Sequence, residues 1–314
     1  MLKDLLEKRN CFKLVCGAGN EDAIEVEKLV TLYAKAGCRF FDLSAKEEII
    51  DAAKSGILKS GVKDAYLCVS VGIKGDPHIS KAQIDYEKCI GCGKCDEICP
   101  NNAIIYHKVK NMKCIGCGKC AKVCSKGAIS YTSENIDLNI VLPSLIEKGI
   151  DCIELHAMGT DEEDILSKWE TINKLYTGMV SICTSHGKIS DEAMIKRIKR
   201  MLNYRSPYTT IIQADGFPMS GGRDDYKTTL QAVATAEIVQ NENLPVYLML
   251  SGGTNTKTAE LASLCGIKFN GVAVGSYARK IVREQIDCED FLENPVIFEK
   301  ALIKAEKLVQ SVQF

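Results

Sequence analysis

The sequence predicts an α/β protein, a (β/α)8 barrel of the TIM type that is interrupted after its third strand by a small cysteine-rich domain. Short apolar runs alternate with amphipathic stretches along most of the 314-residue chain. The apolar runs are continuous, as expected for parallel strands that are buried on both faces. Without the cysteine-rich segment at residues 83–132, about 264 residues remain, close to the ~250 of one such barrel.

Eight apolar runs are candidates for the barrel strands, and helical patterns separate them. The predicted strands are Phe12–Cys16, Cys38–Leu43, Ala65–Val71, Asp151–Leu155, Gly178–Cys183, Thr209–Gln213, Pro245–Leu250 and Gly271–Val274. The predicted helices are Asp22–Ala36, Glu47–Lys59, Leu138–Lys148, Asp161–Leu175, Asp191–Asn203, Asp224–Asn241, Lys257–Cys265 and one that begins near Ser276. Several open with Asp, Ser or Thr and close near Gly or Asn, as helices do. A doubly wound open sheet is the alternative fold.

This pattern divides the chain into three segments. Residues 1–82 would form the first part of the barrel, residues 83–132 the inserted domain, and residues 133–314 the rest of the barrel and the C-terminal helices.

The inserted domain contains two successive cysteine runs, KCIGCGKCDEICP and KCIGCGKCAKVCS. Each has the Cys-x2-Cys-x2-Cys-x3-Cys spacing of a bacterial ferredoxin with two [4Fe–4S] clusters, in which the fourth Cys of each run ligates the other cluster. The predicted ligand sets are Cys89, Cys92, Cys95 and Cys124 for one cluster, and Cys114, Cys117, Cys120 and Cys99 for the other. Zinc knuckles are the alternative, but they would leave two of these cysteines without a role.

The other eight cysteines stand singly, mostly in apolar runs, and are interpreted as small buried hydrophobic residues of a protein in the reducing cytoplasm. They are Cys11, Cys16, Cys38, Cys68, Cys152, Cys183, Cys265 and Cys288. The N-terminus lacks the features of a signal peptide, and no apolar stretch approaches the ~20 residues of a membrane span. A formal net charge of −1 gives no electrostatic reason to expect binding to nucleic acid.

If the barrel forms, the insertion leaves from the C-terminal end of the third strand, so we expect its clusters to lie over the barrel mouth, where barrel enzymes build their sites. Loops after the seventh and eighth strands are candidates for binding phosphate on backbone N–H groups. The candidate cofactor-binding residues are Gly252, Gly253, Thr254, Asn255, Gly275, Ser276 and Arg279. The alternative is that this SGGTN segment only makes a tight turn capped by Thr254 or Asn255.

Four titratable side chains follow strands and are candidate catalytic residues: Asp42, His156, His186 and Asp215. Either histidine could instead be structural, and Asp42 could only cap a strand end. The loop Asp215–Arg223 is rich in Gly and Pro, so it either covers a ligand at the mouth or is an ordinary surface loop.

Several phrases in this order resemble the light-dependent-period-A family of iron–sulfur proteins. They are FKLVCGA at Phe12–Ala18, GDPH at Gly75–His78, IELHA at Ile153–Ala157, QADGFPMSG at Gln213–Gly221 and GGTN at Gly252–Asn255. In cyanobacteria this family is associated with reporting cellular redox state to the circadian clock, and it also occurs in bacteria without such a clock. The resemblance implies an iron–sulfur redox protein on a barrel scaffold.

Two functional classes remain open. In the first, the clusters relay electrons between an electron-transfer protein or small redox molecule and a ligand at the mouth, such as FMN. In the second, the chain is a redox-sensing regulatory or interaction protein without turnover. Paired clusters favour the first class, whereas the lack of an identifiable catalytic triad, acid–base pair or mononuclear metal motif favours the second.

Overall fold

A computed structural model describes residues 1–73, 76, 79–132, 136–185, 187, 189–216 and 223–312. Within them, eight parallel strands close into a barrel in the order β1-β12-β11-β10-β9-β8-β3-β2. These strands are β1 (Cys11–Val15), β2 (Phe40–Ser44), β3 (Tyr66–Val71), β8 (Cys152–His156), β9 (Met179–Thr184), β10 (Thr210–Asp215), β11 (Tyr247–Ser251) and β12 (Gly271–Val274). The predicted barrel is confirmed. The open sheet is wrong, because β1 pairs with both β2 and β12.

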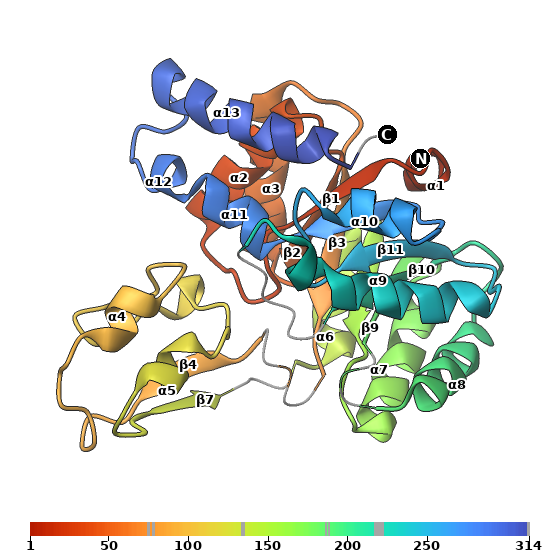
Figure 1. The fold of residues 1–314 in the computed structure, drawn as a ribbon, viewed down its shortest axis with the longest axis horizontal. Coiled ribbons are helices and arrows are strands. Elements are labelled where there is room, and N and C mark those ends of the chain that lie inside the picture. The colour runs from red at the N-terminus through yellow and green to blue at the C-terminus, as the bar shows by residue number, and fades with distance from the viewer. Residues whose placement is uncertain are drawn as a thin grey trace.

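Helices surround the barrel (Figure 1). They are α2 (Ala23–Lys35), α3 (Glu47–Ser60), α6 (Leu138–Glu147), α7 (Glu162–Leu175), α8 (Asp191–Leu202), α9 (Tyr226–Asn241), α10 (Thr258–Leu264), α11 (Ser276–Ile281), α12 (Arg283–Ile286) and α13 (Pro295–Gln310). Side chains of Asp22, Asp161, Ser190 and Asp225 accept a hydrogen bond from a backbone N–H in the first turn, which explains where four of these helices begin. In the described part of the chain, no helix is long and apolar enough to cross a membrane.

The sequence reading did not predict the first helix, α1 (Leu2–Glu7). Its Leu2 and Leu6 pack with Cys11 and Phe40 in a small apolar cluster that also contains Cys68, Cys152, Ile211, Tyr247, Met249 and Ala273. Most of these residues come from the first half of a barrel strand. The helix therefore closes the N-terminal end of the barrel with apolar side chains.

The insertion lies between β3 and α6 and forms a lobe beside the barrel (Figure 1). Its elements are β4 (Lys81–Ile84), α4 (Lys94–Ile98), β5 (Ile104–Ile105), β6 (Lys108–Val109), a 3-10 turn (Asn111–Lys113), α5 (Lys119–Val123) and β7 (Ile129–Thr132). Strand β4 pairs antiparallel with β7, and β5 with β6. The sheet of the lobe thus begins at Lys81, slightly before residue 83.

Six of the eight single cysteines are buried, as expected. Cys265 is exposed and Cys288 is half-buried, so the prediction is wrong for these two. Cys265 stands at the C-terminal end of α10, on the outside of the barrel.

Candidate functional site

The eight cysteines of the two runs line two separate cavities in the insertion. One cavity is lined by Cys89, Cys92, Cys95 and Cys124. The other is lined by Cys99, Cys114, Cys117 and Cys120. This is the grouping that a crossed ligand set requires, and four sulfurs around one space suit a cubane cluster.

Backbone groups in the insertion also approach these sulfurs. Backbone N–H groups donate to Cys114 Sγ at 3.4 Å, to Cys99 Sγ at 3.2 Å and to Cys124 Sγ at 3.3 Å. Such donors stabilise the negative charge that thiolate ligands carry. Four glycines between the cysteines, Gly91, Gly93, Gly116 and Gly118, have φ between 64° and 76°, a left-handed conformation that curls each loop around its cavity.

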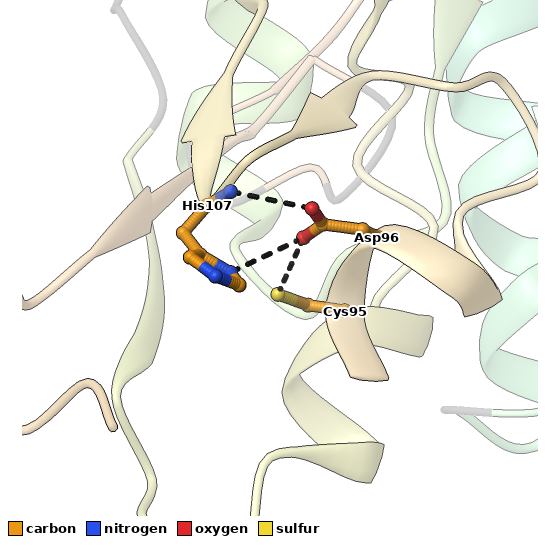
Figure 2. A group of neighbouring side chains, drawn as sticks. All are labelled: Cys95, Asp96 and His107. Atoms are coloured by element: carbon orange, nitrogen blue, oxygen red, sulfur yellow. Dashed lines mark hydrogen bonds and ion pairs between the residues drawn. The ribbon is translucent and has the colours of Figure 1, made fainter. Parts of the chain in front are cut away.

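Figure 2 shows Asp96 and His107 beside Cys95. The Cys95 Sγ lies 3.2 Å from Asp96 Oδ1, the His107 backbone N–H donates to Asp96 Oδ2 at 3.3 Å, and His107 Nδ1 lies 3.6 Å from Asp96 Oδ1. These three residue types can hold a single metal ion. Because Cys95 also faces three other cysteines across one cavity, we interpret Asp96 and His107 as neighbours of that four-sulfur site rather than as a separate site.

A cavity of about 340 Å³ lies at the C-terminal mouth of the barrel, within the size range of small-molecule sites. Its walls include Asp42, Glu154, His156 and Asp215 from the barrel. The insertion contributes Ile115, Gly116, Cys117 and Lys122 to the same cavity. One cysteine of the second group therefore lies at the mouth. A second hollow, of about 420 Å³, is lined by Lys3, Glu7 and Arg9 at the opposite end, away from the cysteines.

The predicted phosphate-binding residues come together at this cavity, with one exception. Gly252, Gly253, Thr254, Gly275, Ser276 and Arg279 line it. Asn255 does not, and its amide instead donates to Arg223 O, Asp225 O and Thr228 Oγ1. Asn255 thus fixes the segment that leads into α9. Gly253 has a φ of 77°, and a Cβ there would collide with the Thr228 carbonyl.

Arg279 is buried at the edge of the cavity. Its Nη1 donates to Val15 O at 2.6 Å, and its Nε has no hydrogen-bond partner among the described residues. Burial lowers the pKa of the guanidinium, which nevertheless stays charged. The cavity wall therefore contains a buried cation, which suits an anionic group of a ligand.

Buried polar side chains form the base of the cavity, and of these the sequence predicted Asp42 but not Lys13, Ser70, Glu154 or Gln213. Lys13 Nζ lies 2.5 Å from Glu154 Oε2, 3.2 Å from Gln213 Oε1 and 3.9 Å from Asp42 Oδ1. Ser70 Oγ donates to Asp42 Oδ1 at 2.6 Å. The available signal was one polar residue inside each of several apolar runs, as in CFKLV, FFDLS, CIELH and IIQAD.

Two of the predicted carboxyl groups at the mouth hold protons more tightly than usual. Burial raises the pKa of Asp42 to about 6, although the charge of Lys13 opposes the shift. Burial also raises the pKa of Asp215 to about 7. Both groups therefore titrate near neutral pH, as acid–base groups often do.

His156 lies close to two carboxylates. Its Nδ1 is 2.6 Å from Asp76 Oδ2, and its Nε2 is 3.7 Å from Glu154 Oε1. Burial opposes the charged imidazolium, but Asp76 and Glu154 outweigh burial and raise the pKa of His156 well above its usual value. The other candidate histidine, His186, lies outside the described residues, as do residues 217–222 of the predicted loop.

Cys183 also lines the cavity. Its Sγ lies 3.0 Å from Glu154 Oε1 and 3.0 Å from Gln213 Nε2. The interpretation of Cys183 as a merely apolar filler is therefore incomplete. Burial raises the pKa of its thiol, which is neutral in these surroundings.

Comparison with known proteins gives matches over almost the whole chain. The profile of the light dependent period A C-terminal domain matches residues 144–311, that of the 4Fe-4S binding domain residues 82–105, and that of the LdpA Fe-S cluster-binding domain residues 95–135. The protein "Light dependent period A" of Synechococcus elongatus is 28% identical over 302 residues, which cover 90% of this chain and 84% of that protein. An uncharacterized ferredoxin of Methanocaldococcus jannaschii is 50% identical over 28 residues, 9% of this chain and 36% of that protein.

Among solved structures, the YdjI aldolase from Escherichia coli matches with a TM-score of 0.47 and 9% identity, covering 97% of this chain and 90% of that one. A truncated 3-deoxy-D-arabino-heptulosonate 7-phosphate synthase from Thermotoga maritima matches with a TM-score of 0.45 and 12% identity, covering 94% and 84%.

Proposed function

This chain belongs to the light dependent period A family and is an iron–sulfur protein, and we propose that it relays electrons through two [4Fe–4S] clusters to or from a ligand at the barrel mouth. One observation carries the proposal. Cys117, a predicted ligand of the second cluster, lines the same cavity as Asp42, His156 and Asp215.

The positions of the two cysteine cavities indicate which cluster would exchange electrons with an external carrier and which with the ligand at the mouth. The second group faces the mouth through Cys117, whereas the first group includes the exposed Cys92. An electron carrier would therefore meet the first cluster at the surface, and the second cluster would exchange electrons with the ligand. Asp96, beside Cys95, adds negative charge near the first cluster and disfavours its reduction.

A phosphate-bearing cofactor such as FMN is the proposed ligand. The cavity wall includes residues whose backbone N–H groups would bind the phosphate, namely Gly252, Gly253, Gly275 and Ser276. Arg279 adds a positive charge to the same wall. The volume of about 340 Å³ admits only part of such a cofactor, so the rest would extend toward solvent. When bound, a flavin supplies a centre that accepts one or two electrons. Asp42 and Asp215 would hold or deliver protons beside it.

A redox sensor without turnover is the second candidate. The exposure of Cys92 favours it, because oxidants can reach a cluster whose ligand lies at the surface. In that case the mouth would bind a signal molecule or a partner instead of a substrate.

Metal analysis of anaerobically purified protein tests the cluster proposal. We expect about eight iron and eight sulfide per chain, and about half of each in Cys117→Ala. Cys265→Ser, at an exposed cysteine outside both groups, should keep the full content. Only about four iron in fully loaded protein would contradict the proposal of two clusters.

Acid precipitation then distinguishes the two candidates. It destroys the clusters and releases any noncovalent flavin, whose absorbance and fluorescence can be measured in the supernatant. A released flavin, together with magnetic coupling between its semiquinone and the reduced second cluster before precipitation, supports the relay. A fully loaded protein that releases no phosphate-bearing cofactor favours the sensor.

A further inference from the structure

Tyr131 lies against the second cysteine group. It stands on β7, is half-buried, and lines the same cavity as Cys99, Cys114, Cys117 and Cys120. Its hydroxyl oxygen lies 3.0 Å from Cys120 Sγ, where the two groups share a hydrogen bond. The hydroxyl therefore contacts a predicted ligand of the second cluster directly.

The direction of this hydrogen bond follows from the state of the sulfur. Either partner could donate when Cys120 is a free thiol. A cysteine that ligates iron is a thiolate, however, and has no hydrogen to donate. Burial raises the pKa of Tyr131, so its phenol stays protonated. In the loaded protein Tyr131 is therefore the donor and Cys120 Sγ the acceptor.

The neighbouring strand fixes Tyr131 and brings a second donor to the same group. Ala82 lies opposite Tyr131 in the β4–β7 sheet, and its backbone N–H donates to Cys114 Sγ at 3.4 Å. The ring of Tyr131 packs against an apolar cluster that contains Ala82 and Ile104. Strand pairing and packing thus hold the hydroxyl beside Cys120.

The corresponding cysteine of the first run has a different neighbour. Cys95 is the third cysteine of its run, as Cys120 is of the second. A carboxyl oxygen of Asp96 lies 3.2 Å from Cys95 Sγ, and an ionised carboxylate cannot donate a hydrogen bond. Equivalent ligands of the two clusters therefore have a hydroxyl donor in one case and a carboxyl group in the other.

Hydrogen bonds to the sulfur atoms are among the factors that set the reduction potential of an iron–sulfur cluster. A donor stabilises the additional negative charge of the reduced cluster, so reduction becomes more favourable. We propose that Tyr131 donates to Cys120 Sγ and thereby raises the reduction potential of the second cluster. One electron that leaves the reduced first cluster is then accepted more readily by the oxidised second cluster, next to the mouth. This inference rests on the proposed function, because it requires both clusters.

Potentiometric titration of the loaded protein, followed by electron paramagnetic resonance, tests the role of Tyr131. Tyr131→Phe removes only the hydroxyl and keeps the ring. We expect about eight iron per chain in the wild type and in the variant. Reduction of one cluster should be about tenfold less favourable in Tyr131→Phe, a fall of about 59 mV for a one-electron couple. The potential of the other cluster should not change.

Tyr86→Phe is the matched control. Tyr86 also lies in the insertion, but its hydroxyl donates to the backbone oxygen of His107 at 3.1 Å, so its loss should leave both potentials unchanged. Adding Tyr131→Phe to Cys117→Ala, which should hold only the first cluster, identifies the affected cluster, because the remaining potential should not move. A shift in this double variant, or equal shifts in Tyr131→Phe and Tyr86→Phe, would overturn the proposal.

Electron–nuclear double resonance of the reduced protein in heavy water gives a readout besides the potential. We expect the coupling of one exchangeable deuteron to the second cluster to be present in the wild type and in Tyr86→Phe, and to be lost in Tyr131→Phe. Unchanged spectra and potentials in fully loaded Tyr131→Phe would refute this role and leave the electron relay intact. A loaded wild type with only about four iron would instead contradict the two clusters that the relay requires.

Discussion

Lys13 is the residue on which the polar interior of the barrel depends. It is 1% exposed and contacts Glu154 and Gln213 directly, with Asp42 at 3.9 Å. A buried ammonium group is tolerated only where carboxylates compensate for its lost hydration. Conversely, Lys13 and His156 outweigh burial and lower the pKa of Glu154 well below its usual value, so this carboxylate stays charged.

Replacing Lys13 with Met should destabilise the protein by about 3–5 kcal/mol, because Glu154 would lose its buried counter-charge. Anaerobic urea unfolding followed by circular dichroism measures the change. Adding Glu154→Gln to Lys13→Met should recover much of the loss, since the remaining site is neutral. If Lys13→Met alone is as stable as the wild type, the ion pair between Lys13 and Glu154 contributes nothing to stability.

Asp42 should titrate with a pKa of about 6 in the folded protein. This exceeds the value of about 3.9 in an unfolded chain, so the folded state holds the proton more tightly. The stabilisation due to Asp42 is therefore complete below about pH 4 and is lost as the pH rises through about 6. An infrared carboxyl band that is absent from Asp42→Asn should titrate near pH 6; a midpoint near 4 would contradict the prediction.

Among the elements, the loop between β1 and α2 joins the barrel to the insertion. Lys81 Nζ donates to Gly19 O at 2.5 Å and to Cys114 O at 3.0 Å, and it lies 3.3 Å from Glu21 Oε1. The Glu21 backbone N–H also donates to Met112 O at 2.8 Å. Lys113 Nζ adds an ion pair with Asp22 Oδ2 at 3.2 Å, so the loop between β1 and α2 holds the second cysteine group against the mouth through two lysines.

Lys81→Met should loosen this junction, because Gly19 O, Cys114 O and Glu21 lose a shared cationic donor. We expect faster amide hydrogen exchange at residues 112–117 and weaker coupling between the second cluster and any mouth ligand. Lys88→Met is the matched control, since Lys88 is exposed and its ion pair among the described residues is with Asp85 in its own turn. Unchanged exchange in Lys81→Met would refute a role for this lysine.

At the scale of the whole molecule, charge is unevenly distributed. The chain has a formal net charge of −1, yet residues 83–132 contain eight lysines and four acidic residues. Lys94 and Lys126 are exposed and border the cavity of the first cysteine group, and Ile90 beside them is 62% exposed. An apolar spot ringed by positive charge suits an acidic electron-carrier protein.

Reversing two of these charges, in Lys94→Glu/Lys126→Glu, should slow reduction by an acidic one-electron carrier about tenfold at low ionic strength. The difference should shrink at ~1 M salt, where the Debye length falls to about 3 Å. Stopped-flow bleaching of the clusters measures the rate. Lys300→Glu, at an exposed lysine on α13, should change the reduction rate little. An equal decrease of the reduction rate in both variants would contradict docking of the carrier at the insertion.

Local sequence patterns determined the eight strands, most of the helix starts and the two cysteine runs. A continuous apolar run specifies a buried parallel strand wherever it stands, and an Asp or Ser before an amphipathic stretch caps its helix, as Asp22 and Ser190 do. The cluster ligands could be predicted for the same reason, because the three closely spaced cysteines of each Cys-x2-Cys-x2-Cys run lie on one loop and their spacing is a local property of the sequence.

Only the tertiary structure decided which of these residues meet. Lys13, Glu154 and Gln213 lie far apart in the sequence and come into contact because the closed barrel brings the same level of three strands together. The same closure turned Cys183 into a cavity residue and left Asn255 outside the cavity. The alternation of residues along a strand predicts whether a side chain points into the barrel or out of it. The stagger between strands in the closed barrel determines the level of that side chain along the barrel axis, and side chains at the same level become neighbours.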